Sequence, residues 1–258
     1  MKRFLKVAAA LLIALFLFLY SLRFIPIHIY DGFESPSLSW IRWSSYRFAP
    51  AAVVPEQSIV RSGHQALAIT VHSGDIYEAA SEEGAATERA ELMESWWLVS
   101  RAGRTYTHSF SLFIPKDLPQ TSERLVIAQW KQLCWRCHPD NPVIAIRLEN
   151  ARLLITHTSL HRNVLYQGEE DVRGRWLDFR FVIKFENGKH GSIDATLDAH
   201  DIIHYQGPTL YRPARGYSPE KALIYFKTGL YRDAHNEPPW TIYVDEYRKD
   251  ECPDQGCG

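Results

Sequence analysis

Apolar and polar residues alternate with a period of two along many short segments of this chain after Pro26. Such a period places successive side chains on opposite faces of an extended backbone, so each segment predicts a β-strand with one buried face. Turn-forming clusters such as 186–189 (ENGK) separate the segments, and no helical apolar stripe runs beyond the N-terminus. The clearest predicted strands are 66–72, 105–114, 143–148, 153–158, 176–185, 192–198 and 241–247.

Roughly 230 of the 258 residues follow the N-terminal segment, which is enough for one large β domain. No repeat, low-complexity tract or linker divides them. The alternation therefore predicts a single all-β domain over residues 26–258, either a sandwich or a jelly roll. The net charge of −1 gives no reason to expect a nucleic-acid partner, and a polyanionic ligand would need a local basic groove.

The first 25 residues have the pattern of an export signal, with three basic residues among the first six and an apolar run at 7–20. Bulky residues end this run, which favours an uncleaved hydrophobic anchor helix over a removed peptide. The run is shorter than the ~20 residues of a comfortable span, so cleavage stays open. We expect an exported protein on the periplasmic side of a bacterial cytoplasmic membrane, held in the membrane through residues 1–25 or secreted after cleavage.

The four cysteines form two close pairs, Cys134 with Cys137 and Cys252 with Cys257. An even count in an exported chain favours disulfides, either as two local loops or in a crossed arrangement. A zinc site of four thiolates is the alternative, although the second spacing is loose for a half-site. The string Cys-x-x-Cys-His at 134–138 also matches a haem-attachment motif, but the all-β context favours a disulfide-closed loop.

Three further segments, 87–92 (TERAEL), 127–131 (IAQWK) and 225–232 (YFKTGLYR), separate polar from apolar residues when they are written as strands. Gly229 leaves a gap in the third segment, where a ligand ring could approach the backbone. One predicted face carries Ala90, Leu92, Ala128, Trp130, Phe226 and Leu230. The opposite face carries Arg89, Glu91, Gln129, Lys131, Tyr225, Lys227 and Tyr231.

The ordered set Arg-x-Glu-Leu, Gln-Trp-x and Tyr-Phe-Lys-x-Gly-x-Tyr resembles the heparin lyase I and glucuronan lyase family, and a related trio marks the jelly-roll alginate lyases. The segments GRWLDFRFVIKF, TLDAHDII and TIYVDEY are similar to the later part of that family. The resemblance covers most of residues 30–248. It implies a single β-jelly-roll (concanavalin-like) sandwich whose concave sheet binds an acidic polysaccharide and cleaves it by β-elimination.

The resemblance also implies roles for individual residues. Arg89 and Gln129 would neutralise the carboxylate of a uronate and so stabilise an enolate-like transition state. Tyr231 would protonate the departing oxygen and could also remove the C5 proton, with help from cations on other strands. Substrate contacts would come from Lys227, Glu91, Tyr225 and Arg232.

Lys131 stands where the family usually has a catalytic histidine. A lysine there could neutralise the carboxylate or, if desolvated, act as a base. Alternatively, His138 or His157 supplies the imidazole, or catalysis is lost and only carbohydrate binding remains. Other histidines, such as His64 and His108, are expected at the surface or in turns.

Purely structural roles for these motifs, and a different enzyme class, are the alternative interpretations. Taken singly, the charged motifs are ordinary strand faces, and Trp96-Trp97 is either a sugar-stacking platform or part of the core. A glycoside hydrolase would need two carboxylates flanking the scissile bond, and no strand carries such a set. We expect a monomer without a cofactor or metal; calcium occurs in some relatives, but no oxygen-ligand set is evident here.

Overall fold

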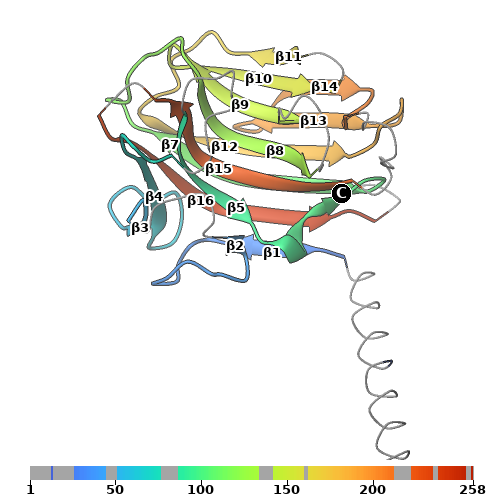
Figure 1. The fold of residues 1–258 in the computed structure, drawn as a ribbon, viewed down its shortest axis with the longest axis horizontal. Helices are drawn as coiled ribbons and strands as arrows, with labels where there is room; N and C mark the ends of the chain where they lie inside the picture. The colour runs from blue at the N-terminus through green and yellow to red at the C-terminus, as the bar shows by residue number, and fades with distance from the viewer. Residues whose placement is uncertain are drawn as a thin grey trace, which may run out of the picture.

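The computed structural model describes residues 13, 26–44, 51–76, 87–133, 142–159, 162–211, 222–234, 238–253 and 257. Two antiparallel β-sheets pack face to face (Figure 1), so the prediction of an all-β sandwich is confirmed. The predicted anchor falls on residues 1–25, almost all of which lie outside the described residues, and it stays a prediction. Within the described part of the chain, no helix is long and apolar enough to cross a membrane.

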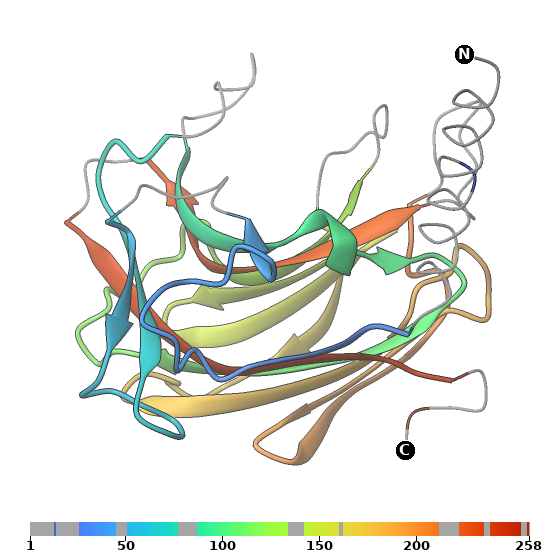
Figure 2. The same cartoon turned by 90° about the horizontal axis from the view of Figure 1, so that it is seen from below.

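Figure 2 shows that both sheets bend in the same direction, so one sheet has a concave outer face and the other a convex one. The convex sheet has the order β14-β13-β12-β7-β16-β4-β3, with β1 also paired to β16. Its strands are β1 (His28–Asp31), β3 (Val53–Glu56), β4 (Ala66–Val71), β7 (Thr105–Ile114), β12 (Arg175–Lys184), β13 (Ser192–Leu197), β14 (His200–Gln206) and β16 (Trp240–Glu251).

The concave sheet has the order β11-β10-β9-β8-β15-β5-β2, with β6 also paired to β15. A single 3-10 turn, η1 (Trp96–Leu98), separates β5 from β6. The strands of this sheet are β2 (Trp43–Ser44), β5 (Thr87–Glu94), β6 (Ser100–Arg101), β8 (Leu125–Leu133), β9 (Ile144–Glu149), β10 (Arg152–Thr158), β11 (Arg162–Gln167) and β15 (Leu223–Asp233).

Local sequence accounts for several of these elements. β7 spans the predicted segment 105–114, and its residues alternate between buried and partly exposed over most of its length. The hairpins β9-β10 and β13-β14 turn at Asn150-Ala151 and Asp198-Ala199, where both residues have positive φ, as in the primed turns that suit the twist of paired strands. Such turns keep consecutive strands adjacent and hold their register.

The core lies between the sheets and is rich in aromatic rings. Trp130 and Phe226 of the concave sheet are fully buried, with ring centroids 4.9 Å apart. Phe110 and Phe181 of the convex sheet pack against Trp130 at 6.2 and 4.8 Å. The predicted inner faces of 87–92, 127–131 and 225–232 are therefore confirmed, and burial of these rings holds the two sheets together.

His108 does not lie at the surface as predicted. It is fully buried on the inner face of β7, with its ring 5.4 Å from Trp130 and 5.7 Å from Phe226. Burial, helped by the charge of Lys249, lowers the pKa of His108 well below its usual value, so the ring is neutral. Period-two alternation along β7 places His108 on the same buried face as Phe110. The surface prediction was wrong because it followed the polarity of the histidine side chain.

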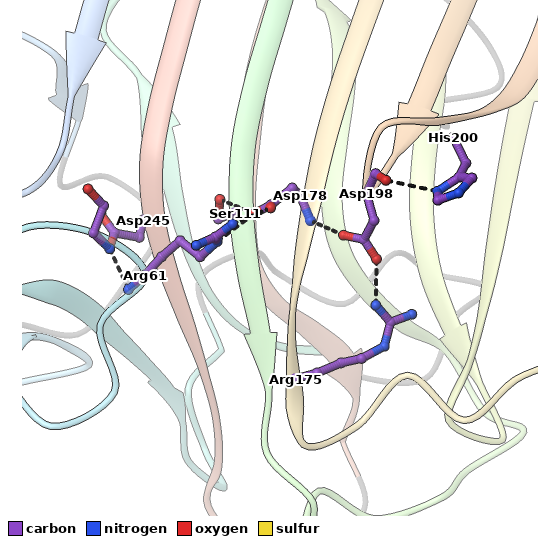
Figure 3. A network of polar contacts seen from close by, with 8 residues as sticks. Arg61, Ser111, Arg175, Asp178, Asp198, His200 and Asp245 are labelled. Atoms are coloured by element: carbon purple, nitrogen blue, oxygen red, sulfur yellow. Dashed lines mark hydrogen bonds and ion pairs between the residues drawn. The ribbon is translucent and has the colours of Figure 1, made fainter.

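The convex outer face carries a network of charges that satisfy one another (Figure 3). Arg61 donates two hydrogen bonds to Asp178, at 3.0 and 2.7 Å, and Ser111 donates a third at 2.7 Å. The contact with Arg61 lowers the pKa of Asp178. Asp198 accepts from Arg175 and from the backbone N–H of Asp178. These contacts fasten the segment around Arg61 to β12, which is a structural role.

Cys252 and Cys257 form a disulfide, so the second pair is a local loop and the crossed arrangement is excluded. A bridged pair also rules out the alternative of a zinc site built from all four thiolates. Cys134 and Cys137 lie outside the described residues, and their pairing stays a prediction. Within the described ranges, no group of three or more histidine, cysteine, aspartate or glutamate side chains could hold a metal ion.

Candidate functional site

The three motifs come together on neighbouring strands at the centre of the concave sheet. β15 pairs with β5 on one side and with β8 on the other (Figure 1). In this register Tyr231 lies opposite Arg89, and Lys227 lies opposite Gln129. The polar side chains of segments separated by up to about 140 residues therefore share the concave face, as the alternation predicts. We call this set of side chains on β5, β8 and β15 the candidate site.

Glu91 is the centre of the charged contacts in the candidate site. One carboxylate oxygen accepts from Gln129, and the other lies 2.7 Å from the ammonium of Lys227 and 3.5 Å from the guanidinium of Arg89. All four residues are at most 4 % exposed. Glu91 was predicted to bind substrate, but its carboxylate is occupied by the protein's own donors, which gives it a positioning role.

Opposing effects act on the pKa of Glu91. Burial alone would raise that pKa, but the positive charges of Lys227 and Arg89 outweigh burial, and the pKa falls below its usual value. Glu91 is therefore an anion held inside a cage of cations and an amide. Burial lowers the pKa of Lys227 to about 8, against the opposing attraction of Glu91. The pair combines a firmly ionised carboxylate with an ammonium whose pKa lies below its usual value.

Tyr231 lies between two guanidinium groups. Arg89 stacks over its ring, 4.2 Å from the centroid, and Nη1 of Arg124 donates a hydrogen bond of 3.1 Å to its phenolic oxygen. Because that oxygen accepts from Arg124 on one side, its other side is left for a proton exchanged with a ligand. Arg124 was missed from the sequence, since it lies one residue before β8 and outside the three motifs. It places a second cation beside Tyr231, in addition to Arg89.

Lys131 lies at the opposite end of the candidate site from Tyr231. It pairs with Tyr225, whereas Tyr231 pairs with Val126, five residues away along β8. At about 3.3 Å per residue this separation is ~16 Å. The C5 proton and the O4 oxygen removed in an elimination belong to adjacent carbons, so this separation favours a role for Lys131 at a different sugar residue. Lys131, Tyr225 and Tyr231 are all half-buried.

The two histidines considered as substitutes do not enter the described site. His157 lies on the inner face of β10, fully buried, with its ring 4.9 Å from that of Tyr205 in the convex sheet. Burial lowers the pKa of His157 to about 4. The proposal that it supplies an imidazole to the concave face is therefore wrong. His138 lies outside the described residues.

Arg232 is also not part of the candidate site, contrary to its predicted substrate contact. Alternation along β15 turns it away from Tyr231 toward the interior, where it is 1 % exposed. It donates to Glu88 at 2.8 Å and to the carbonyl oxygen of Pro238, and it stacks 4.5 Å from the ring of Trp240. These contacts anchor the end of β15 and leave nothing to meet a ligand.

Bulges set the position of Tyr231. Thr228 pairs with Ala128 and Tyr231 with Val126, so β15 has two residues between these positions where β8 has only Ile127. Gly229 adopts a φ of 137° here, and a Cβ at this residue would lie 2.2 Å from the carbonyl oxygen of Ala90. Only glycine fits this close approach, which is a backbone requirement rather than room for a ligand ring.

Trp96 and Trp97 are not core residues. They are 55 % and 64 % exposed, and the indole N–H of Trp97 donates to the carbonyl oxygen of Ile41 at 3.1 Å. The core-packing alternative is therefore wrong, and the sugar-stacking alternative stays a prediction.

Known proteins give the following comparisons. A family model described as "Polysaccharide lyase" matches residues 35–248. The endo-β-1,4-glucuronan lyase of the fungus Trichoderma reesei gives a TM-score of 0.64 at 15 % identity, over 87 % of this chain and 95 % of that one. An alginate lyase of polysaccharide lyase family 7 gives 0.54 at 16 %, over 80 % and 85 %.

A structure of another chemical class is similar as well. The catalytic domain of a glycoside hydrolase family 131 protein from Coprinopsis cinerea gives a TM-score of 0.56 at 14 % identity, over 88 % of this chain and 95 % of that one. No curated protein matches the sequence. At these identities the likeness establishes a shared fold, and a shared fold does not select a reaction. The choice depends on the side chains of the candidate site.

Proposed function

Because the chain belongs to the polysaccharide lyase family, we propose that it cleaves a uronate-containing polysaccharide by β-elimination at the candidate site. The family membership confirms the resemblance that the three motifs carry. One observation gives the strongest support for β-elimination. The phenolic oxygen of Tyr231 accepts a hydrogen bond from Arg124 while Arg89 covers its ring.

The proposed reaction uses Tyr231 as the proton carrier. Its phenolate oxygen takes the C5 proton of a uronate residue, the electron pair of that bond forms the C4–C5 double bond, and the C4–O4 bond breaks. Tyr231 then returns the proton to the departing O4 oxygen. The guanidinium groups of Arg89 and Arg124 lie where they stabilise negative charge on the phenolic oxygen while the proton is transferred.

The uronate carboxylate must be neutralised for the C5 proton to be removed. Arg89 stacks on Tyr231 and is 4 % exposed, so its positive charge would act on a carboxylate beside the phenol from beneath the surface, with the amide of Gln129 joined to it through Glu91. Glu91 holds Arg89, Gln129 and Lys227 in fixed positions before substrate arrives. Such preorganisation stabilises the developing enolate without rearrangement during the reaction.

Glycoside hydrolysis is the less favoured function, because Glu91 and Asp233 in this chain are too widely spaced for it. Glu91 lies opposite Gly229 on β15, and Asp233 lies four residues further along that strand. The backbone positions are therefore ~13 Å apart along the strand, whereas the carboxyl groups of a hydrolase pair are ~5–9.5 Å apart. Glu91 is also enclosed by protein donors, and Asp233 pairs with Arg124 at 3.4 Å.

The second alternative is a carbohydrate-binding protein without activity, and one assay separates it from a lyase. The full chain is incubated with polymers of glucuronate, mannuronate and guluronate while ultraviolet absorbance is followed. Elimination produces a conjugated, unsaturated uronate, and we expect absorbance to rise with the parent protein and not with Tyr231→Phe. The matched control is Tyr243→Phe, which removes a hydroxyl from the convex face, where the Tyr243 ring packs against Phe113.

The control variant should cleave at the parent rate. Binding of these polymers without any rise in absorbance would support the inactive carbohydrate-binding protein instead. Equal activity of the Tyr231→Phe variant would remove Tyr231 from the mechanism. An exported location would bring the protein to such polymers, in agreement with the basic and apolar N-terminal pattern.

A further inference from the structure

A patch of exposed apolar side chains lies at the β2 edge of the concave sheet. Two chain segments form it, one leading into β2 and the other containing η1. Trp40 and Ile41 of the first segment are 75 % and 55 % exposed, and Trp96 and Trp97 of the second are 55 % and 64 % exposed. We call these four side chains the tryptophan patch. Large apolar side chains grouped in this way at the surface of a domain mark a place that meets a partner.

Hydrogen bonds hold the two segments of the tryptophan patch together. The indole N–H of Trp97 donates to the carbonyl oxygen of Ile41 at 3.1 Å. The hydroxyl of Ser95 donates to the carbonyl oxygen of Trp40 at 3.1 Å, and its backbone N–H donates to that of Arg42 at 2.9 Å. The patch is therefore built on a fixed backbone, and a partner can meet it without rearrangement of the domain.

The tryptophan patch lies next to the place where residues 1–25 join the domain. β1 follows that segment closely, and the indole N–H of Trp43 in β2 donates to Asp31 at the end of β1 at 2.8 Å. Figure 1 shows β1 and β2 along the same edge of the sandwich. Residues 21–27 alone separate the apolar run 7–20 from β1, so the run ends within ~28 Å of that strand. A membrane that holds the run is therefore within reach of the patch.

The composition of the two segments suits a phospholipid surface. Tryptophan is enriched where the hydrocarbon of a bilayer meets the headgroups, because its ring is largely apolar and carries one polar N–H group. Residues 38–44 and 95–101 include Arg42 and Arg101 and contain no acidic residue. Cations beside an apolar patch are attracted to the phosphate groups of anionic lipids, and neither segment has a carboxylate to repel them.

We propose that the tryptophan patch is a docking surface for the phospholipid membrane that holds residues 1–25. This inference rests on the predicted N-terminal anchor and is independent of the reaction at the candidate site. An anchor alone leaves the domain free to turn, whereas an anchor and a docked patch together fix its orientation. Arg89 lies five residues before the end of β5, so the Tyr231 end of the candidate site is held ~16 Å along that strand from the docked edge.

Quenching of tryptophan fluorescence by brominated lipids tests the proposal, because bromine on the acyl chains quenches only the indoles that approach it. Residues 1–25 contain no tryptophan, so insertion of the anchor itself gives no signal. The full chain is reconstituted in nanodiscs of phosphatidylcholine and phosphatidylglycerol, with and without bromine. The test variant carries Trp96→Phe and Trp97→Phe together. The matched control is Trp176→Phe, at a partly exposed tryptophan on β12 of the convex sheet.

We expect brominated lipid to lower the tryptophan emission of the parent chain. The double variant should lose about two thirds of that quenching, since two of the three indoles of the patch are gone, and Trp176→Phe should keep all of it. A parent chain that is not quenched, or that does not associate with the nanodiscs, overturns the proposal. Equal quenching in the double variant also overturns it, and weaker binding of uronate polymers by that variant would then assign the patch to sugar stacking.

Discussion

The ammonium of Lys227 lies 2.7 Å from a carboxylate oxygen of Glu91, and both side chains are 2 % exposed. Two ionised groups in such a place stabilise each other only as long as both are present, because each would otherwise lose its hydration without a partner. Glu91 also holds Arg89 and Gln129. The whole candidate site therefore depends on one carboxylate that is not expected to touch the substrate.

Glu91→Gln should damage both stability and activity. Arg89 and Lys227 would remain buried without an anion, at a cost of about 3–5 kcal/mol in the free energy of unfolding. Urea unfolding and kcat, measured on the folded fraction, check this expectation. Glu169→Gln, an exposed acid in a loop, is the control that should behave as the parent. A Glu91→Gln variant as stable as the parent would contradict the network described here.

Lys131→Gln and Lys131→His should affect substrate binding more than the chemical step. Lys131 pairs with Tyr225 at the end of the candidate site away from Tyr231, so the loss of its charge should raise KM several-fold and leave kcat within about threefold. The histidine variant restores the residue usual in related lyases and should remain active. A fall in kcat of ~100-fold or more in Lys131→Gln would instead make Lys131 a proton-transfer residue.

Arg232→Met should destabilise the fold without changing KM in the molecules that remain folded. The substitution leaves Glu88 buried and charged, which costs about 3–5 kcal/mol. Adding Glu88→Gln removes that charge and keeps an acceptor for the backbone N–H of Gly74, so the double variant should recover most of the loss. Denaturant midpoints and KM for the single and double variants check this. A rise in KM in Arg232→Met would return Arg232 to the binding surface.

Stability should fall as pH falls from about 6.5 to about 4. His157 has its pKa lowered to about 4 in the folded protein, so in this window the unfolded chain binds a proton that the folded chain does not. Each such group contributes a slope of up to ~1.4 kcal/mol per pH unit, and the buried His108 adds to it. Below pH 4 the contribution of His157 becomes constant.

A His157→Phe variant tests this attribution. A phenyl ring suits the apolar contact with Tyr205, so stability near pH 7 should change little while the slope between pH 6.5 and 4 becomes shallower. His64→Asn, at an exposed position, should keep the parent slope. Unfolding free energies measured at several pH values give both slopes. A His157→Phe slope equal to that of the parent would show that the acid sensitivity has another origin.

The faces of the strands followed from the sequence because period-two alternation is a local property. It placed Trp130 and Phe226 inside, and Gln129 and Lys227 outside, before any pairing was known. It also turned Arg232 inward, against the substrate contact expected for that residue. The grouping of the three distant segments on one face was predicted from the family resemblance, which depends on the order of the three motifs along the chain.

Pairing across strands was not available from the sequence, and the residues that it controls were missed. Arg124 and Arg147 reach the neighbourhood of Tyr231 through the register of β15, β8 and β9, which bulges displace from simple alternation. The prediction that Glu91 contacts the ligand was wrong for the same reason, since its partners lie on neighbouring strands. A list of polar residues on one face does not show which of them bind one another.

The bulges beside Tyr231 make neighbouring strands of the concave sheet differ in the number of residues that span the same distance. The same advance across the sheet takes three residues in β15, from Thr228 to Tyr231, two in β8 and one in β9. The bend at this point is thus written into the lengths of the strands, and substitutions of side chains on the concave face leave it in place. Chains that share this framework can exchange the residues that meet the sugar, and so change the polymer they accept, while the curve that receives it persists. An insertion or a deletion within these strands, or a larger residue at Gly229, would disturb it.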